Sequence, residues 1–265
     1  MSSTAISTFE RLKDRYRLSG QLLAATGLRV GGGDRSQHAA TQSPIIRDAL
    51  GRPFIPGSSL KGVLRSGLES LLRGLDHERL KACDPFEDRC TEALEEKAKK
   101  TSRAPELDEV VEKLCTACAL FGSPLLAGRV FVRDLALEEN GTVTTEIRDG
   151  VGINRDLRTA QAKVKYDLEV VPVGSRFSLE MIVENPNLGQ LGLVLEALAM
   201  LDRGELLVGG LTSRGLGRVR VEGLKLEHTN ARRLFTGQGW QEQNLEETRS
   251  KAQDVLRELL AEGGN

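Results

Sequence analysis

The chain has 265 residues, of which 39% are hydrophobic and 28% charged, and its net charge is −1. This length and composition are typical of a globular protein with a sizeable core, and the near-zero net charge argues against a protein that coats nucleic acid through bulk charge. The sequence contains neither a membrane span of about 20 apolar residues nor an apolar N-terminal signal, so we expect no membrane association and a cytoplasmic location.

Positive charge is nevertheless concentrated in the first quarter of the chain. Residues 1–75 contain 11 lysines and arginines against 5 acidic residues, whereas residues 76–120 contain 8 against 12. A local basic excess suits a polyanionic partner, but a solvated charged surface gives the same pattern, and charge alone favours that second explanation.

The first predicted strand covers residues 16–25, where apolar residues alternate with polar or small ones. It leads into a loop that contains Gly27 and three consecutive glycines at 31–33. After the turn signal at 56–57, leucines recur at helical spacing, so we expect a helix over residues 59–73 with Ser58 or Ser59 as its N-cap.

Residues 76–118 have the character of an insert with two charged helical stretches, at 91–100 and 106–114. Four cysteines in a cytoplasmic chain do not suggest a disulfide framework. The pair Cys115 and Cys118 has the spacing of a zinc knuckle, while Cys83 and Cys90 are spaced more loosely. We favour a structural zinc site that pins the ends of the insert together, because so charged an insert has little core of its own. His77 could replace one cysteine, and four buried thiols are the alternative.

Beyond the insert, strands and helices alternate. We expect a hairpin of strands 130–137 and 142–147 around the turn signal Asn140-Gly141, followed by a long, polar and basic segment at 148–166. The later predicted elements are strands at 166–173, 178–183 and 218–224, a buried helix at 188–201 and an amphipathic helix at 245–260.

Without the insert and the exposed segment, the predicted order is strand–helix–strand–strand–helix–strand. Its natural closure is an antiparallel sheet with both helices on one face, the ferredoxin-like arrangement of the α+β class. We therefore expect a single domain over residues 1–265 with large insertions.

Segment 57–66 combines two hydroxyls at a helix start with two cations. Lys61 and Arg65 are about one helical turn apart and project from one face, while Ser58 and Ser59 stand at the helix start. Such a helix start suits a phosphate group, although an ordinary capped amphipathic helix explains the same residues.

Segment 209–221 is a glycine loop that feeds a strand, with Arg214 at its centre. Its glycines, Gly209, Gly210, Gly215 and Gly217, would let the backbone approach a ligand and offer N–H groups to an anion. The G-K-[ST] ending of a Walker loop is absent, and the helix of a Rossmann motif does not follow. A strained connection between helix and strand is the alternative.

Asp34 and His38 lie in the loop after the first predicted strand. A carboxylate beside flexible backbone and basic residues can bind a metal or help to activate a 2′-hydroxyl. An aspartate that caps a turn and a histidine at the surface are the simpler alternatives.

Together these segments resemble the RAMP superfamily of CRISPR-associated proteins, and most closely the Csm-type backbone subunit of type III effector complexes. The resemblance covers residues 16–224 and is carried by TGLRVGGGD (26–34) with SPIIRD (43–48), FIPGSSLKGVLRSGLE (54–69), CTACALFGS (115–123), RDGVGINRDLRTAQ (148–161) and GGLTSRGLGRVRV (209–221).

The resemblance implies a core like an RNA-recognition motif with a metal-binding helical insert at 76–120, a β-hairpin thumb at 140–173 and a C-terminal helical extension at 226–265. Subunits of this family stack as a filament along a guide RNA, and the thumb displaces a nucleotide of the guide–target duplex at regular intervals. The implied partners are the guide crRNA, the target RNA, further copies of this chain and other CRISPR effector subunits. By the same resemblance Lys61, Arg65, Arg155, Arg214 and the loop glycines would hold the RNA backbone, while base pairing reads the sequence.

In active members of the family, an aspartate in the loop after the first strand supports target-RNA cleavage that depends on a divalent cation such as Mg²⁺ or Mn²⁺. Asp34 occupies the matching place, and His38 is a second candidate. The implied reaction is attack of the target's own 2′-hydroxyl on the adjacent phosphate, which leaves a cyclic phosphate and a 5′-hydroxyl. Asp34 would position the cation or accept the proton.

Three other functions stay open at this level. The same scaffold could bind RNA without cleaving it. A guide-processing endonuclease is less favoured, because such enzymes use a histidine, tyrosine and lysine cluster, whereas the 3 histidines and 2 tyrosines here are scattered. A zinc-stabilised ferredoxin-like domain of unrelated purpose would not co-purify with RNA.

Overall fold

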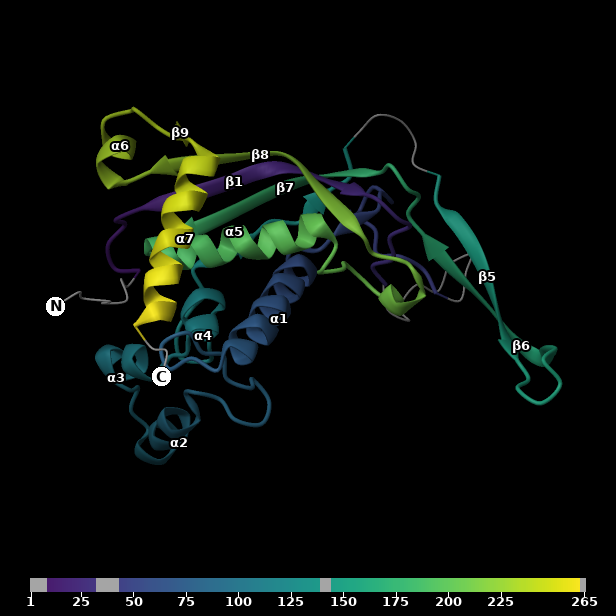
Figure 1. Ribbon diagram of the computed structural model, residues 1–265, viewed down its shortest axis with the longest axis horizontal. Coiled ribbons are helices and arrows are strands. Elements are labelled where there is room, and N and C mark those ends of the chain that lie inside the picture. The colour runs from purple at the N-terminus through teal and green to yellow at the C-terminus, as the bar shows by residue number, and fades with distance from the viewer. Residues whose placement is uncertain (1–8, 32–42, 139–143, 263–265) are drawn as a thin grey trace.

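The computed structural model describes residues 9–31, 43–138 and 144–262. Its centre is a five-stranded antiparallel sheet in the order β3-β7-β1-β8-β9 (Figure 1). The prediction of a mixed fold built on an antiparallel sheet is confirmed. The strands are β1 (Arg15–Ala24), β3 (Val130–Val132), β7 (Arg176–Glu184), β8 (Val219–Thr229) and β9 (Gln241–Gln243).

One face of this sheet is apolar and the other is charged. Leu18 and Leu22 of β1 are fully buried, opposite Met181 and Phe177 of β7. The intervening residues point to the opposite face, where Arg17 forms two hydrogen bonds with Glu227, each 2.7 Å long. This period-two alternation is what an antiparallel sheet with one solvated face requires.

Two long helices cover the apolar face of the sheet (Figure 1). Helix α1 (Gly57–Leu75) buries Leu60, Leu64 and Leu68, and helix α5 (Leu188–Arg203) begins with a capping box between Asn187 and Gln190. Helix α7 (Leu245–Ala261) crosses α5 closely. The expected helices at 59–73, 188–201 and 245–260 are therefore present, and no helix within the described residues is long and apolar enough to cross a membrane.

The expected insert contains three short helices at one end of the molecule (Figure 1). They are α2 (Glu92–Thr101), α3 (Leu107–Lys113) and α4 (Thr116–Phe121), of which α4 was not predicted. A further short helix, α6 (Ala231–Phe235), connects β8 to the edge strand β9 and was not predicted either.

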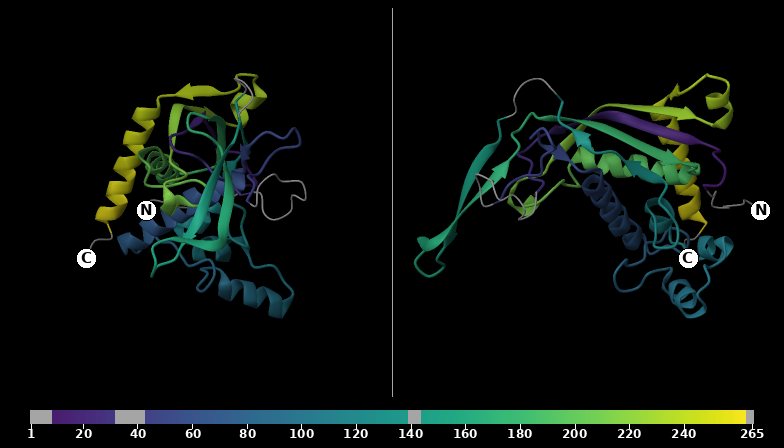
Figure 2. Two further views of the ribbon diagram at one scale, coloured as in Figure 1. Left: turned by 90° about the vertical axis from the view of Figure 1, so that its right-hand side faces the viewer. Right: turned by 180° about the vertical axis from the view of Figure 1, so that it is seen from behind.

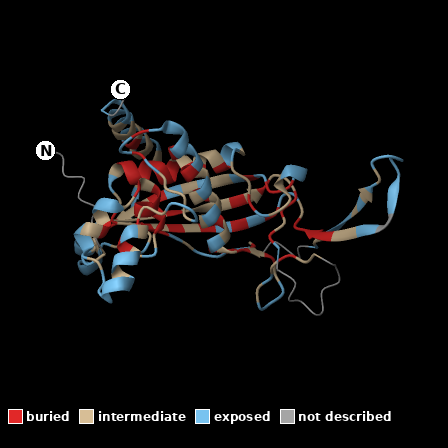
Figure 3. Cartoon of the chain, turned by 90° about the horizontal axis from the view of Figure 1, so that it is seen from below, coloured by how far each residue is buried: buried red, intermediate tan, exposed pale blue. Residues whose placement is uncertain are grey.

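A two-stranded hairpin of β5 (Glu146–Ile153) and β6 (Ala160–Val170) projects from the other end (Figure 2). The prediction that 142–147 pairs with 130–137 is wrong, because β5 pairs with β6 while β3 pairs with β7. The turn signal Asn140-Gly141 lies outside the described residues. Figure 3 shows that buried residues gather in the body of the molecule and that most of the hairpin is exposed.

The single strand predicted at 130–137 is split in two. Its second part, β4 (Leu135–Ala136), pairs with β2 (Phe54–Ile55) instead of with the central sheet. Between the two parts, Asp134 accepts a hydrogen bond from the N–H of Gly57 at 2.8 Å. The predicted N-cap is also wrong, because α1 begins after Pro56 without a side-chain cap from Ser58 or Ser59.

Candidate functional site

A groove of about 810 Å³ joins the first glycine loop, one face of α1 and the second glycine loop. Ser59, Gly62, Ser66 and Ser70 of α1 line one side, and the other side is formed by Gly209 and Gly210 together with Glu205, Leu206 and Leu207. Small side chains leave room for a bulky ligand, and hydroxyls and backbone amides are common partners of phosphate. The groove thus brings together three predicted binding residues, Ser59, Gly209 and Gly210, that lie far apart in the sequence.

Gly62, Ser66 and Ser70 are groove residues that sequence analysis missed. They continue from Ser59 along one helical face, and a stripe of small residues at that spacing is the signal that could have revealed them.

The four glycines of the second loop play two different roles. Gly209 and Gly217 have positive φ angles of 87° and 91°. A Cβ on Gly209 would lie 2.2 Å from the carbonyl oxygen of Arg29, and one on Gly217 would lie 2.5 Å from that of Val208. Packing against the chain itself therefore requires both glycines.

Gly210 and Gly215 have open space instead. A Cβ on Gly210 would meet only Nη1 of Arg29, at 3.5 Å, and one on Gly215 would meet nothing within 4 Å. These two glycines are the positions at which a ligand could approach the loop backbone.

Arg29 is a further candidate that sequence analysis missed. Its guanidinium lies beside Gly31 and Gly210, so it stands where the two glycine loops meet. Its Nε is buried without a hydrogen-bond partner among the described residues. A guanidinium in this position suits a phosphate oxygen. The sequence signal that could have revealed Arg29 is its position within the glycine-rich segment TGLRVGGGD.

Asp34 and His38 lie outside the described residues, but the two ends of their segment are described. Gly31 and Ile45 form a β-bridge, and the N–H of Ile46 donates to the carbonyl of Val30 at 2.9 Å. Gly31 also lines the groove. The two ends of the segment therefore meet beside the groove.

Glu169 of β6 binds the C-terminal end of that segment, at Ile45 and Arg47. Its carboxylate accepts hydrogen bonds from the N–H of Ile45 at 3.0 Å and from Thr145 Oγ1 at 2.6 Å, and it pairs with Arg47. Burial would raise the pKa of Glu169, but these three hydrogen bonds hold it below its usual range. One carboxylate thus joins the segment after the first glycine loop to both strands of the hairpin.

The second glycine loop is fixed to the middle of the same hairpin. Arg214, in the 3₁₀ turn Thr212–Arg214, donates from Nη1 to the hydroxyl of Tyr166 at 2.6 Å. Gly150 opposes Tyr166 across the hairpin, and a Cβ there would lie 2.2 Å from the tyrosine ring. Arg155 lies far from these contacts, at the exposed tip.

Arg65 faces away from the groove. It donates to Glu69 Oε1 at 2.7 Å, to the carbonyl of Gly122 at 3.1 Å and to Cys118 Sγ at 3.5 Å. Lys61 lies near it: burial lowers the pKa of Lys61, and the positive charge of Arg65 lowers it further. The sequence placed both cations at a phosphate site with Ser58 and Ser59, but Ser59 lines the groove while Ser58 is exposed.

The four cysteines form a cluster in which all Sγ atoms lie within 4.8 Å of one another. Four sulfurs bonded to a zinc ion at about 2.3 Å would be about 3.8 Å apart, so the cluster could hold a metal ion with little adjustment. Cys115 precedes α4, and its Sγ accepts hydrogen bonds from the N–H groups of Cys83 and Cys118, each at 3.4 Å.

These hydrogen bonds favour a thiolate at Cys115. The Cys118 thiol and the two backbone N–H groups donate to its sulfur, which lowers the pKa of Cys115 to about 5 despite its burial. Burial raises the pKa of Cys90 to about 11. A bound cation would favour the thiolate at each cysteine, as metal coordination requires.

His77 lies outside this cluster. Its Nδ1 accepts hydrogen bonds from the N–H groups of Arg79 and Leu80 at 3.1 and 3.3 Å. Among the described residues, the group that could hold a metal consists of the four cysteines alone.

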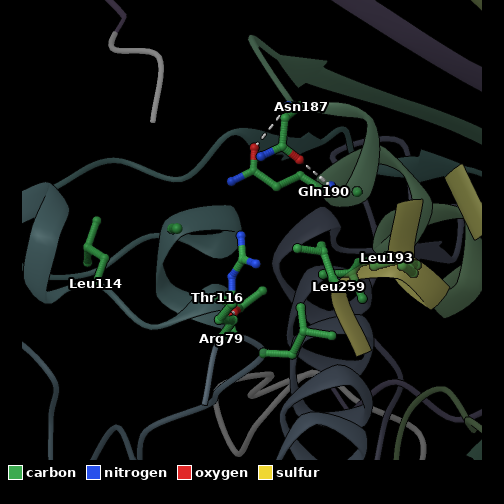
Figure 4. Close-up of a pocket in the computed structure, with 11 residues that line it drawn as sticks. Arg79, Leu114, Thr116, Asn187, Gln190, Leu193 and Leu259 are labelled. Atoms are coloured by element: carbon green, nitrogen blue, oxygen red, sulfur yellow. Dashed lines mark hydrogen bonds between the residues drawn. The ribbon is translucent and has the colours of Figure 1, made fainter. Parts of the chain in front are cut away.

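A separate hollow of about 290 Å³ lies between the insert, the start of α5 and α7 (Figure 4). Its polar lining includes Arg79, Thr116 and the capping pair Asn187 and Gln190, while leucines such as Leu193 and Leu259 form the rest. It contains none of the predicted binding, catalytic or metal-ligating residues.

Comparison with known proteins relates residues 21–220 to the RAMP superfamily. Three proteins named CRISPR system Cms endoribonuclease Csm3 are similar to the chain. The one from Methanothermobacter thermautotrophicus is 30% identical over an alignment 246 residues long, which covers 82% of this chain and 87% of that protein. The one from Mycobacterium tuberculosis is 30% identical over 80% of this chain and 88% of its own length. The one from Methanocaldococcus jannaschii is 29% identical over 81% and 82%.

Proposed function

The chain belongs to the RAMP superfamily and is a Csm3-like CRISPR protein, and from that premise we propose that it is the guide-RNA-binding backbone subunit of a type III effector complex that cleaves complementary RNA. The observation that carries the proposal is the groove, which joins two glycine loops and a helix face of small and hydroxyl residues. Similar proteins named as CRISPR endoribonucleases support the activity.

We propose a ferredoxin-like core, similar to an RNA-recognition motif, within a single RAMP domain over residues 1–265. The elements β1, α1, β3, β7, α5 and β8 follow the expected chain order, and their strands occur in the order β3-β7-β1-β8. In this core, residues 76–120 form a metal-binding insert, 140–173 a thumb, and 226–265 a C-terminal extension.

The guide RNA would lie along the groove with its phosphates toward the backbone at Gly210 and Gly215. Arg29 would pair with a phosphate, and Ser59 would donate a hydrogen bond to another. Arg214 would supply further positive charge at the second glycine loop, Lys61 would add charge from beside Arg65, outside the groove, and Gly209 and Gly217 shape the loop. Sequence would be read by base pairing and not by the protein.

The hairpin of β5 and β6 would act as the thumb that reaches toward the neighbouring copy of the chain. Its exposed tip carries Arg155, which would contact the RNA of the guide–target duplex. Copies of the chain would stack along the guide crRNA with the other effector subunits, and the duplex would be distorted at each thumb.

Cleavage would use the target's own 2′-hydroxyl. Its oxygen bonds to the adjacent phosphorus while the bond to the 5′-oxygen breaks and that oxygen takes a proton from solvent, which leaves a cyclic phosphate and a 5′-hydroxyl. Asp34 would hold the divalent cation, Mg²⁺ or Mn²⁺, or accept the proton of the 2′-hydroxyl. The cation would supply charge neutralisation at the phosphate.

The cysteine cluster would hold a structural zinc ion through Cys83, Cys90, Cys115 and Cys118. The site joins residues from both ends of the insert, and the insert helices α2 and α3 each bury only one side chain. Zinc would therefore fix the insert against α1.

A pair of matched variants tests the groove. Gly62 and Gly74 both lie on α1, and a Cβ at either one meets nothing within 4 Å, but only Gly62 lines the groove. Gly62→Glu should weaken binding of guide RNA about tenfold at low salt, because its carboxylate would face phosphate. The loss should shrink at high salt, and Gly74→Glu should bind like the wild type. Equal RNA affinity of the two variants in a filter-binding assay would overturn the groove as the RNA site.

A further inference from the structure

Three charged residues form a ladder along one side of α1. Glu69 stands between Arg65 and Arg73, one helical turn from each, and is 6% exposed. Its Oε1 accepts a hydrogen bond from Arg65 Nε at 2.7 Å, and its Oε2 accepts one from Arg73 Nη2 at 3.5 Å. One nearly buried carboxylate therefore orients both guanidinium groups.

This ladder reaches both halves of the cysteine cluster. Arg65 Nη2 lies 3.5 Å from Cys118 Sγ, in the second cysteine pair. Arg73 Nη2 lies 3.3 Å from the carbonyl oxygen of Cys83, in the first pair. Arg65 also donates to the carbonyl of Gly122, at the end of α4. The contacts come from α1, which precedes the insert, so they tie the cluster to the body of the fold.

The contacts with the arginines would offset the negative charge of a metal-loaded cysteine cluster. Four thiolates and one divalent cation carry a net charge of −2, which is costly away from water unless a positive group lies close. Among the described residues, Arg65 is the cation that contacts a cysteine sulfur, and its side chain is only 25% exposed. A hydrogen bond from a guanidinium to a thiolate lowers that cost and fixes the direction of the sulfur.

We propose that Arg65 is a positioning residue of the metal site, which with Glu69 and Arg73 holds the two cysteine pairs at metal-binding distance and offsets their negative charge. The inference rests on the proposed metal site and assigns a role to residues beyond the four ligands. It also gives Arg65 a different task from contact with RNA.

The test compares three variants of the full-length protein with the wild type. Arg65→Met removes the charge and all three hydrogen bonds, while Arg65→Lys keeps the charge but loses the fork of donors. Arg249→Met is the control, because Arg249 is similarly exposed at 28% and pairs with Glu246 on α7, away from the cysteines. Zinc affinity is measured by competition with a chromophoric chelator, and Co²⁺ is used to record the thiolate-to-cobalt charge-transfer band.

Arg65→Met should bind zinc about 10- to 100-fold more weakly than the wild type and shift the cobalt band. Losses of this size are expected when a hydrogen-bond donor to a metal ligand is removed. Arg65→Lys should fall between the two, and Arg249→Met should stay within about twofold of the wild type. If Arg65→Met does not fold, the zinc affinity of Arg65→Lys is compared with that of Arg249→Met, and weaker binding by Arg65→Lys supports the proposal.

Unchanged zinc affinity and an unchanged cobalt band in the Arg65 variants would overturn the positioning role while the metal site itself stands. A wild-type protein that binds neither ion would overturn the metal site and the inference with it, and would leave the RNA groove untouched. Equal loss of thermal stability with and without metal would show Arg65 to be a packing residue only, which also contradicts the proposal.

Discussion

At the residue scale, Glu169 joins segments that are distant in the sequence. Its carboxylate accepts hydrogen bonds from Ile45, Arg47 and Thr145, and its own N–H donates to the carbonyl of Ser43 at 3.2 Å. The ionised form satisfies all three side-chain contacts at once, so its pKa is held low even though the group is nearly buried.

Glu169→Gln should reduce the free energy of unfolding by about 1–3 kcal/mol near neutral pH, because it removes a charged acceptor from the buried N–H of Ile45, from Thr145 and from Arg47. The folded-state pKa is below that of an unfolded glutamate, so the stabilisation is present above pH of about 4.3 and is lost as the pH falls through the folded pKa. The difference between wild type and variant should therefore shrink on acidification.

Urea unfolding at several pH values measures this difference, and Glu246→Gln, at an exposed position, serves as the control. A difference that stays constant between neutral and strongly acidic pH would contradict the role assigned to the Glu169 carboxylate.

Spacing predicted that Lys61 and Arg65 share a face, and they do lie close together. It could not predict which neighbour that face meets, because the contact with Cys118 depends on how the insert folds back on α1. Likewise, the sequence does not distinguish Gly209, where a side chain would collide with a backbone carbonyl, from Gly210, where open space would admit a ligand.

At the element scale, α1 contacts three different parts of the molecule: the sheet, the groove and the cysteine cluster. Its leucines pack on the sheet, its small residues line the groove, and its charged ladder contacts the cysteine cluster. The helix and its leucine face followed from periodicity alone. The start of the helix did not, since the N–H of Gly57 bonds to Asp134, a residue far along the chain.

The strand pairing of the hairpin also depends on contacts that local sequence does not predict. An Asn-Gly signal predicts a turn from local sequence, but pairing of strands is a long-range choice. Here Tyr166 lies over Gly150, and Val164 approaches Gly152 so closely that a Cβ would be 2.6 Å from its Cγ1. These cross-strand fits between glycines and large side chains favour β5 with β6.

Replacing residues 151–165 by Asn-Gly should remove the outer hairpin without unfolding the protein. None of the described side chains among the deleted residues belongs to the hydrophobic core, whereas Tyr166 and its bond to Arg214 remain. We expect a melting temperature within a few degrees of the wild type, guide RNA still bound, and loss of cleavage at regular sites. Unchanged regular cleavage by the complex would contradict the thumb assignment.

At the scale of the whole molecule, opposite charges occupy different parts of the fold. The basic excess of residues 1–75 belongs to β1, the first glycine loop and α1, while the acidic excess of residues 76–120 belongs to the insert. The insert lies at the end of the molecule opposite the hairpin (Figure 1). A net charge of −1 is therefore the sum of segments of opposite sign, and within the fold the β1 arginines Arg15 and Arg17 pair with Glu184 and Glu227 of neighbouring strands.

The order of the core elements and the family could be predicted from the sequence, because each depends on local periodicity and on blocks of adjacent residues. The groove could not, since Ser59 and Gly210 meet only when α1 packs beside the second glycine loop. Arg29 was missed for the same reason: its neighbours Gly31 and Gly210 come together only in the fold.

The most direct test of the central claim is to purify the wild-type chain with its native partners and give the assembly RNA complementary to the guide that co-purifies with it. We expect bound guide RNA, cuts at regular intervals in the presence of Mg²⁺ or Mn²⁺, and loss of those cuts with retained binding in Asp34→Ala. An assembly that carries no RNA, or that binds the complementary RNA and leaves it intact, would contradict the account of this chain as the cleaving backbone.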